Sequence, residues 1–262
     1  MRKFHTALAL FWVACASTAK APQAEAVHTC FLLYDLDHGE LVREGDACTT
    51  RVTPASTFKI PHALAALDSG VLASPSVTFS PPADLEQDVP ETWKRDHSLQ
   101  TAIRYLVVWY FQRVALLLGL ERERDYLARF HYGNQDVSSG GTTFWLEESL
   151  KISPDEQETF LVNLYRDRLP MSVPAMRTVR ELLIQPKGVV VNAMGEHPFD
   201  APWPEDAVVS TKTGMSMHVR WLVGHVRRGE RALVFVSCVT GQSPPLSAID
   251  LAAASLKRAA IL

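Results

Sequence analysis

The 262-residue chain has four cysteines, no excess of basic residues and, after its first residues, no apolar run long enough to span a bilayer. Its formal net charge of -3 gives no indication of a nucleic-acid partner. The missing apolar run predicts no membrane span in the mature chain. The histidines show no H-E-x-x-H or similar spacing and no G-x-S-x-G occurs, so neither a metal site nor a lipase-type triad is indicated.

The first 26 residues have the pattern of a secretory signal peptide. Arg2 and Lys3 form a basic start, and a short apolar stretch with small residues follows. Cleavage after Ala19 or Ala26 is compatible with the pattern, and we favour Ala26. A lipoprotein site at Cys15 is disfavoured, because Trp12 occupies a position where such sites carry a small aliphatic residue. The sequence therefore predicts a periplasmic or secreted protein.

Three cysteines would remain after cleavage. Cys30 and Cys48 flank a candidate hairpin, and an exported protein meets an oxidising compartment, so a disulfide between them is plausible. Closing a loop of this length would contribute about 3 kcal/mol in the chain-entropy model. Two unpaired thiols are the alternative. Cys238 lies in the apolar run ALVFVSCV and is expected in the core.

Strand patterns are found near both ends of the mature chain. Residues 29–36 and 40–45 read as a hairpin, and residues 207–214, 219–228 and 231–239 read as further strands, the last two joined at Gly229-Glu230. Residues 246–262 have a helical apolar stripe. These patterns predict one antiparallel sheet built from both chain ends, with a terminal helix against it.

The middle of the chain is mostly helical in pattern. Helices are expected over 58–70, over 98–130 with a break near Gly119, and over 173–184. Residues 152–170 begin with Ser153, Pro154 and Glu156, a capping box with the favoured proline. Residues 188–207 are expected to form a surface loop leading into a strand.

The predicted fold is α+β, an α/β sandwich in which an all-helical insertion packs against the sheet. Residues 27–262 would form a single domain, with a sheet lobe of about 27–55 and 190–262 and a helical lobe of about 56–189. A groove between the lobes is the natural place for a ligand.

Ser56 and Lys59 are the first candidates for chemistry. They lie three residues apart, so on a helix they share a face. A serine hydroxyl becomes a good nucleophile when a base takes its proton, and burial would lower the pKa of a lysine toward that task. Taken alone, the pair is accounted for more simply by a helix-capping serine and a surface lysine.

Lys212, Thr213 and Gly214 lie in a candidate strand. Lys212 and Gly214 would face one side and Thr213 the other. The lysine would attract an anionic substrate, and the glycine would permit close approach of a ligand. Taken alone, a surface lysine before a turn accounts for the motif equally well.

S-x-x-K followed by K-T-G is the pattern of serine β-lactamases and penicillin-binding proteins. Further stretches, including STFKIPHAL, WKRDHSLQTAIRY, FHYGN and FWLEESLKISPDEQETFL, resemble the class D enzymes, or oxacillinases. The resemblance extends from about Cys30 to the C-terminus. It implies the penicillin-binding/serine β-lactamase fold and hydrolysis of the β-lactam amide, with antibiotic resistance as the outcome.

The resemblance also implies roles for single residues. Ser56 would be the acyl-enzyme nucleophile, and Lys59, carboxylated by carbon dioxide, the general base. Trp145 would support that carbamate by a hydrogen bond, a plain core aromatic being the alternative. The main-chain N–H groups of Ser56 and Met215 would form the oxyanion hole. Other residues are implied to line the substrate site: Val108, Tyr132, Asn134, Lys212, Thr213 and Gly214.

Two positions depart from the family pattern. Leu106 occupies the place of the serine in the S-x-V motif, which in the family shuttles a proton and touches the substrate carboxylate. The arginine that binds this carboxylate in relatives is also missing, and Ser247 lies near its expected position. Arg220 could replace it, although a solvated strand residue would have the same pattern. His225 lies where relatives carry a second tryptophan.

Three functions therefore stay open at this stage. The first is a class D β-lactamase that needs no dissociable cofactor and acts on a small β-lactam as a monomer or homodimer. The second is a penicillin-binding or sensing protein of the same fold that acylates but deacylates slowly, which Leu106 favours. The third is a cell-wall peptidase, against which the class D stretches argue.

Overall fold

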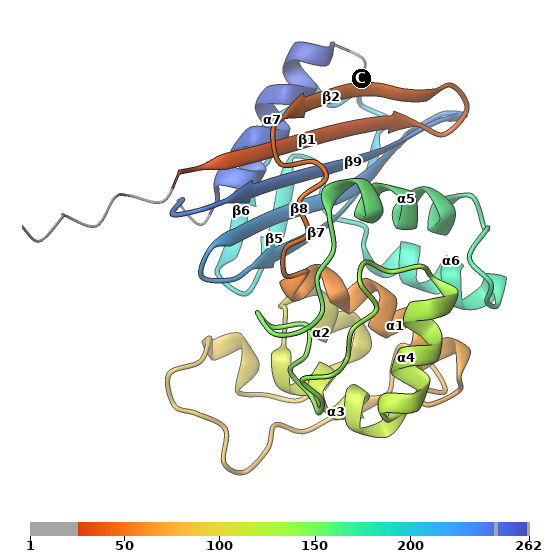
Figure 1. The fold of residues 1–262 in the computed structure, drawn as a ribbon, viewed down its shortest axis with the longest axis vertical. Helices are drawn as coiled ribbons and strands as arrows, with labels where there is room; N and C mark the ends of the chain where they lie inside the picture. The colour runs from red at the N-terminus through yellow and green to blue at the C-terminus, as the bar shows by residue number, and fades with distance from the viewer. Residues whose placement is uncertain (1–25, 244–245, 261–262) are drawn as a thin grey trace, which may run out of the picture.

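A five-stranded antiparallel sheet forms the centre of the computed structural model, which describes residues 26–243 and 246–260. The strand order is β2-β1-β9-β8-β7. Their bounds are β1 His28–Asp35, β2 Gly39–Gly45, β7 Val208–Met215, β8 Val219–Arg228 and β9 Arg231–Thr240. The first and last segments of the chain thus lie side by side, as predicted (Figure 1). The predicted signal peptide lies outside the described residues, except for Ala26.

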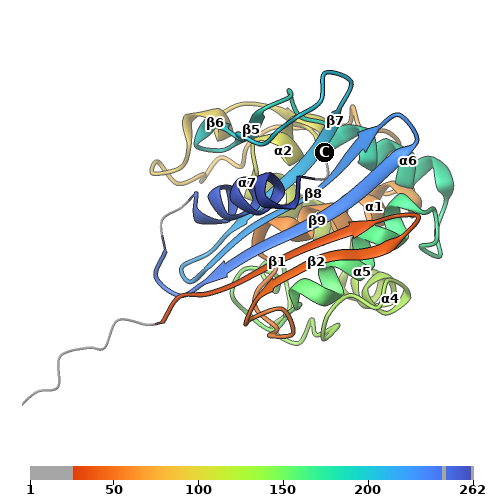
Figure 2. The same cartoon turned by 90° about the horizontal axis from the view of Figure 1, so that it is seen from above.

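Helices cover both faces of this sheet. Helix α7 (Ser247–Ala259) packs on one face, and the helical lobe lies against the other (Figure 2). That lobe contains α1 (Lys59–Asp68), α2 (Leu99–Arg104), α3 (Val108–Leu118), α4 (Leu120–Arg129), α5 (Pro154–Tyr165) and α6 (Val173–Leu182). Two short 3-10 helices, η1 (Ala55–Phe58) and η2 (Glu91–Trp93), and the small strands β3 (Thr78–Phe79) and β4 (His97–Ser98) complete it. The α+β prediction is confirmed.

A hydrophobic core lies on each face of the sheet, because successive side chains along a strand point to opposite faces. Trp221 and Val223 of β8 face the helical lobe, and Leu222 faces α7.

No helix of the described ranges is long and apolar enough to cross a membrane.

Several local predictions are confirmed. Cys30 and Cys48 form a disulfide, and Cys238 is buried beside them on the neighbouring strand. The Ser153 hydroxyl accepts the N–H of Glu156, whose carboxylate accepts the N–H of Ser153, which completes the capping box at the start of α5.

The sequence predicts a surface loop over residues 188–207, and that prediction is wrong for the eight residues that form two short strands. β5 (Val189–Asn192) pairs antiparallel with β6 (Gly195–Pro198). Three consecutive valines favour a strand. The Asn192 side chain accepts the N–H of Met194, and Gly195 has a φ of +115°, so the turn is well defined.

The helical stretch 98–130 is broken twice. The break at Gly119 is confirmed, since this glycine has a φ of 74° between α3 and α4. A second break separates α2 from α3, where Leu106 has a φ of 58°. A leucine in the left-handed region is strained, and such strain is concentrated at functional sites.

Candidate active site

Ser56 and Lys59 lie at the junction of η1 and α1, and their side chains meet. The Lys59 Nζ is 3.0 Å from the Ser56 Oγ. Ala55, directly before the serine, has a φ of 47°, so Ser56 lies on a strained turn. Ser56 retains an exposed fraction of 8%, whereas Lys59 is fully buried. This geometry fits a nucleophile paired with a base.

Burial lowers the pKa of Lys59 from 10.5 to about 7. Within the described ranges no carboxylate forms an ion pair with it, and its hydrogen bond to Ser56 and its position 5.2 Å from the Phe111 ring centroid are its polar contacts. An ammonium group is disfavoured in such a pocket. A substantial fraction of Lys59 is therefore a neutral amine near neutral pH.

The indole of Trp145 is enclosed by aromatic rings. Phe58 stacks on it with centroids 5.6 Å apart, and Phe144 and His62 meet it edge-on at 5.0 and 4.8 Å. Trp145 is fully buried, and its Nε1–H has no hydrogen-bond partner in the described structure. An unsatisfied buried donor is costly, which indicates that this pocket accommodates a further acceptor.

His62 follows Lys59 by one helical turn and forms a buried pair with Glu123 of α4. Their side chains are 0% and 2% exposed, and the His62 Nε2 contacts the Glu123 carboxylate. The pair anchors the imidazole that lies against Trp145. Sequence reasoning did not identify this contact, because the two residues are far apart in the chain.

Replacing Glu123 by alanine is expected to lower the free energy of unfolding by about 3 kcal/mol, because it leaves a buried imidazole unpaired. Chemical denaturation measures this. Glu121→Ala on the same helix is the matched control, since Glu121 is exposed and makes no described ion pair. Equal stability of the two variants would contradict the anchoring role.

Lys212 and Gly214 lie on the face of β7 that is turned toward the nucleophile. A Cβ added at Gly214 would approach Pro54 O and the Thr57 side chain to 3.0 Å. The glycine therefore allows η1 itself, rather than only a ligand, to approach the strand. This contact brings the S-x-x-K and K-T-G motifs to one site.

Lys212 is 4% exposed, and its Nζ donates to Thr213 O at 2.7 Å. Burial lowers the pKa of Lys212 well below its ordinary value, and the charge of Lys59 lowers it further. The charge of Lys59 thus disfavours the charged form of Lys212. An anionic substrate between them would relieve this.

Leu106 faces the same site. It lines a small cavity of about 40 Å³ together with Thr213, Gly214 and Met215. The β5–β6 turn, residues 192–194, closes this cavity on another side. Val108, two residues on, begins α3 and is half-buried, and Met215 is 45% exposed at the end of β7. The sequence did not predict that the β5–β6 hairpin closes this cavity, because the hairpin depends on a turn between two short strands.

Arg220 of β8 pairs in register with Met215 and so lies on the face that carries Thr213. Its guanidinium donates to the main-chain oxygens of Ser216, Val219 and Ser243, but its Nε has no partner within the described ranges. Three further hydroxyls are buried and without described partners: Thr213, Ser243 and Ser247. The Arg220 side chain is therefore partly buried and fixed by main-chain oxygens, rather than freely solvated.

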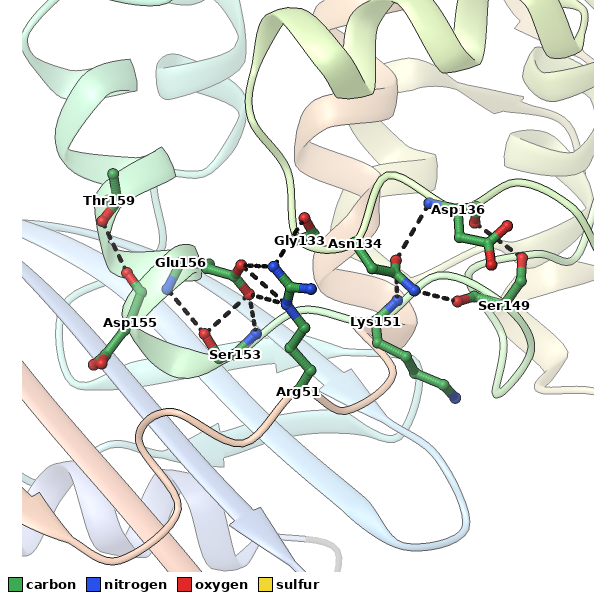
Figure 3. A network of polar contacts seen from close by, with 10 residues as sticks. All are labelled: Arg51, Gly133, Asn134, Asp136, Ser149, Lys151, Ser153, Asp155, Glu156 and Thr159. Carbon is green, nitrogen blue, oxygen red and sulfur yellow. Dashed lines mark hydrogen bonds and ion pairs between the residues drawn. The ribbon is translucent and has the colours of Figure 1, made fainter.

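Tyr132 and Asn134, which are expected to line the substrate site, both make contacts within the helical lobe. Tyr132 is fully buried, packed against Phe58 and Phe160. The Asn134 amide donates to Ser149 O at 2.8 Å, and its Oδ1 accepts the N–H of Lys151 at 2.9 Å (Figure 3). Both side chains are held by contacts within this loop and its neighbours, and their role in lining the substrate site stays a prediction.

Gly133 between them is required by the same loop. Its φ is +57°, and an added Cβ would lie 2.0 Å from Lys151 O. In Figure 3, Arg51 extends toward the same segment and is paired with Glu156 at the start of α5. The Y-G-N motif thus joins the loop to the helix that follows.

Sequence reasoning also missed Thr53. Its hydroxyl donates to Trp145 O at 2.9 Å and accepts the N–H of Glu147 at 3.0 Å, while its carbonyl accepts the Trp221 indole N–H at 2.9 Å. Glu147 in turn accepts the N–H of Met217 just after β7. These contacts tie the tryptophan, the nucleophile turn and the K-T-G strand together. A single threonine before a proline carried no recognisable signal.

Comparison with known proteins places this geometry in a family. The profile of the "Penicillin binding protein transpeptidase domain" matches residues 16–260. The chain is 34% identical to "Probable beta-lactamase YbxI" of Bacillus subtilis over 222 residues, 80% of this chain and 73% of that protein. It is 34% identical to beta-lactamase OXA-19 of Pseudomonas aeruginosa over 238 residues, 88% and 83% of the two chains.

Solved structures agree. The "Class D beta-lactamase BSU-2 delta mutant" superposes with a TM-score of 0.76 at 30% identity, covering 90% of this chain and 93% of the other. The chain belongs to the class D β-lactamases. This class D β-lactamase is accordingly a hydrolase with the penicillin-binding fold. The family supports β-lactam hydrolysis and a resistance function.

Leu106 lines the site with Thr213 and Gly214 but offers no hydroxyl. The Lys212 Nζ donates to the carbonyl of its neighbour Thr213. A proton path through this position therefore needs another group or a water molecule.

Proposed function

We propose that this protein hydrolyses penicillin-type β-lactams through an acyl-enzyme on Ser56, with a carboxylated Lys59 as general base. The observation that carries the proposal is the Ser56 Oγ lying 3.0 Å from the fully buried amine of Lys59. We further propose that the chain is exported to the periplasm or beyond, as a monomer or homodimer.

Three features of the pocket fit a carbamate on Lys59. The amine is neutral for a substantial fraction of molecules near pH 7, which its reaction with carbon dioxide requires. The walls are aromatic, and the Trp145 indole N–H has no described partner. Once formed, the carbamate would supply a base for the proton of Ser56. No dissociable cofactor or metal is part of the proposal.

The protein's own groups account for the remaining steps. The Ser56 Oγ loses its proton and attacks the β-lactam carbonyl carbon, whose oxygen is held by the N–H groups of Ser56 and Met215. The ring C–N bond then breaks, and the nitrogen takes up a proton. Water attacks the ester carbonyl, and Ser56 Oγ leaves with a proton. The net reaction consumes one water per ring opened.

The substrate carboxylate is proposed to bind at Lys212, Thr213 and Arg220. The unpartnered Nε of Arg220 and the hydroxyls of Thr213 and Ser247 support this, as does the start of helix α7 at Ser247. Such a set suits an anion and would replace the arginine that this family usually carries further along the chain.

Replacing Arg220 by glutamine is expected to raise KM and to lower kcat/KM for benzylpenicillin roughly 10- to 100-fold. Losing a hydrogen bond to a charged group costs about 1.5–3 kcal/mol. Steady-state kinetics measure the effect. A penicillin methyl ester, which has no carboxylate, is the matched control substrate and should lose no more than twofold. An equal loss for acid and ester would contradict carboxylate binding at Arg220.

Activity is expected to rise as pH increases through about 7 at fixed dissolved carbon dioxide. Burial lowers the pKa of Lys59 to about 7, so the ammonium predominates below this pH and the reactive amine above it. Added bicarbonate should therefore raise kcat, and carbon-13 NMR with labelled bicarbonate should show one carbamate resonance. No bicarbonate response and no resonance at pH 8 would contradict the carbamate.

A penicillin-binding or sensing protein is the second candidate function, and Leu106 favours it. Without a hydroxyl near the leaving nitrogen, acylation or release is slower, and a long-lived adduct could itself be the signal. The lifetime of the adduct separates the two functions.

A further inference from the structure

A second cavity lies between α6 and the sheet edge formed by β7 and β8. Its volume is about 310 Å³, at the lower end of the range for small-ligand pockets. Ser210 in its wall precedes the K-T-G glycine by four residues on the same strand. None of the groups proposed to act in β-lactam hydrolysis lines it. The role of this cavity is therefore separate from β-lactam hydrolysis.

Three arginines give the cavity a positive charge. Arg180 is already held, since it pairs with Asp167 at 3.0 Å and donates to two main-chain oxygens at the end of α5. The side chains of Arg177 and Arg227 are exposed and make no hydrogen bond or ion pair with a described residue. Glu181 is the one acidic side chain among the lining residues of the described structure. Two guanidinium groups are thus available to an anion.

His225 provides a buried polar group in the same wall. It is 7% exposed, its ring makes no hydrogen bond within the described ranges, and the ring stacks on Tyr165 with centroids 3.8 Å apart and an interplanar angle of 6°. Burial, followed by the charges of Arg180 and Arg227, lowers the pKa of His225 to about 3. The imidazole is therefore neutral near pH 7, with a ring nitrogen left to serve a ligand.

We propose that this cavity binds a small organic monoanion, a carboxylate on a short apolar chain. Arg177 and Arg227 present planar donors, which suit a carboxylate. The apolar part of the wall, which includes Leu36, Ile184 and Val208, suits a hydrocarbon chain. A wholly polar anion would leave this part of the wall unused. The proposal stands independently of β-lactam hydrolysis.

The probe for the test is hexanoate, followed by NMR of the His225 ring signals in the full-length mature protein. A saturable shift of these signals is expected. The double variant Arg177→Gln/Arg227→Gln should weaken binding at least tenfold. Arg228→Gln is the matched control, because Arg228 is an exposed neighbour that pairs with Asp206 at 3.5 Å and does not line the cavity. It should bind hexanoate with unchanged affinity.

Two further arms separate binding in this cavity from non-specific binding and from binding at the Ser56 site. Acetate and hexylammonium should each shift the signals at least tenfold more weakly than hexanoate, since one lacks the chain and the other the negative charge. Arg220→Gln should leave the shift intact, because Arg220 belongs to the Ser56 site. The proposal is overturned if no saturable shift occurs, if acetate equals hexanoate, if the double variant binds normally, or if Arg220→Gln abolishes the shift.

Discussion

Replacing Lys59 by alanine is expected to lower kcat/KM for penicillins by roughly 10²- to 10⁴-fold, the usual contribution of general acid–base catalysis. The hydrogen bond from Nζ to Ser56 Oγ is the polar contact that could activate this hydroxyl in the described structure. Without it, the serine lacks a group to take its proton, and both acylation and deacylation should slow. Single-turnover and steady-state kinetics separate the two steps.

Lys257→Ala is the matched control, because Lys257 lies on α7 and pairs with Asp200 at 2.7 Å, far along the chain from the nucleophile. It should keep wild-type kinetics. Lys59→Ala also removes a buried amine, so its circular dichroism and melting curve must show a folded protein. A folded Lys59→Ala variant with more than one tenth of wild-type activity would contradict the assigned base.

Replacing Leu106 by serine is expected to raise kcat by about 10²-fold, the lower end of a positioned proton donor's contribution. The serine would place a hydroxyl in the small cavity that Leu106 shares with Thr213 and Gly214. Burst kinetics with a chromogenic cephalosporin would show whether deacylation is the step that becomes faster.

The control for this substitution is Leu116→Ser on α3, which removes an exposed leucine away from the groove. It should leave kcat unchanged. A folded Leu106→Ser variant with wild-type kcat would indicate that the leucine does not limit turnover and that another group or a water carries the proton.

Features that depend on short-range patterns were predictable from the sequence. The hairpins, the capping box at Ser153 and the paired cysteines each follow from residues that lie close together or flank one turn. The order of the motifs, S-x-x-K before K-T-G, predicted that Ser56, Lys59 and Lys212 share one site. In the fold, η1 packs closely on Gly214 and so brings the two motifs together.

Features that depend on packing between distant segments were not predictable. The His62–Glu123 pair and the Thr53 contacts join residues with no shared motif. The direction of the Asn134 side chain is set by Lys151 and Ser149 in a later loop. The strand character of Val189–Asn192 was hidden by the prolines and acidic residues that follow it.

The central claim is that Ser56 forms an acyl-enzyme that is then hydrolysed. Its most direct test is intact-mass spectrometry after mixing the protein with a small molar excess of benzylpenicillin. The account predicts an adduct of one penicillin on Ser56, located by peptide mapping, which decays while several equivalents of product accumulate. Product formation with no Ser56 adduct, or full activity of Ser56→Ala, would contradict the acyl-enzyme. An adduct that lasts for hours without product would contradict hydrolysis and leave the binding function.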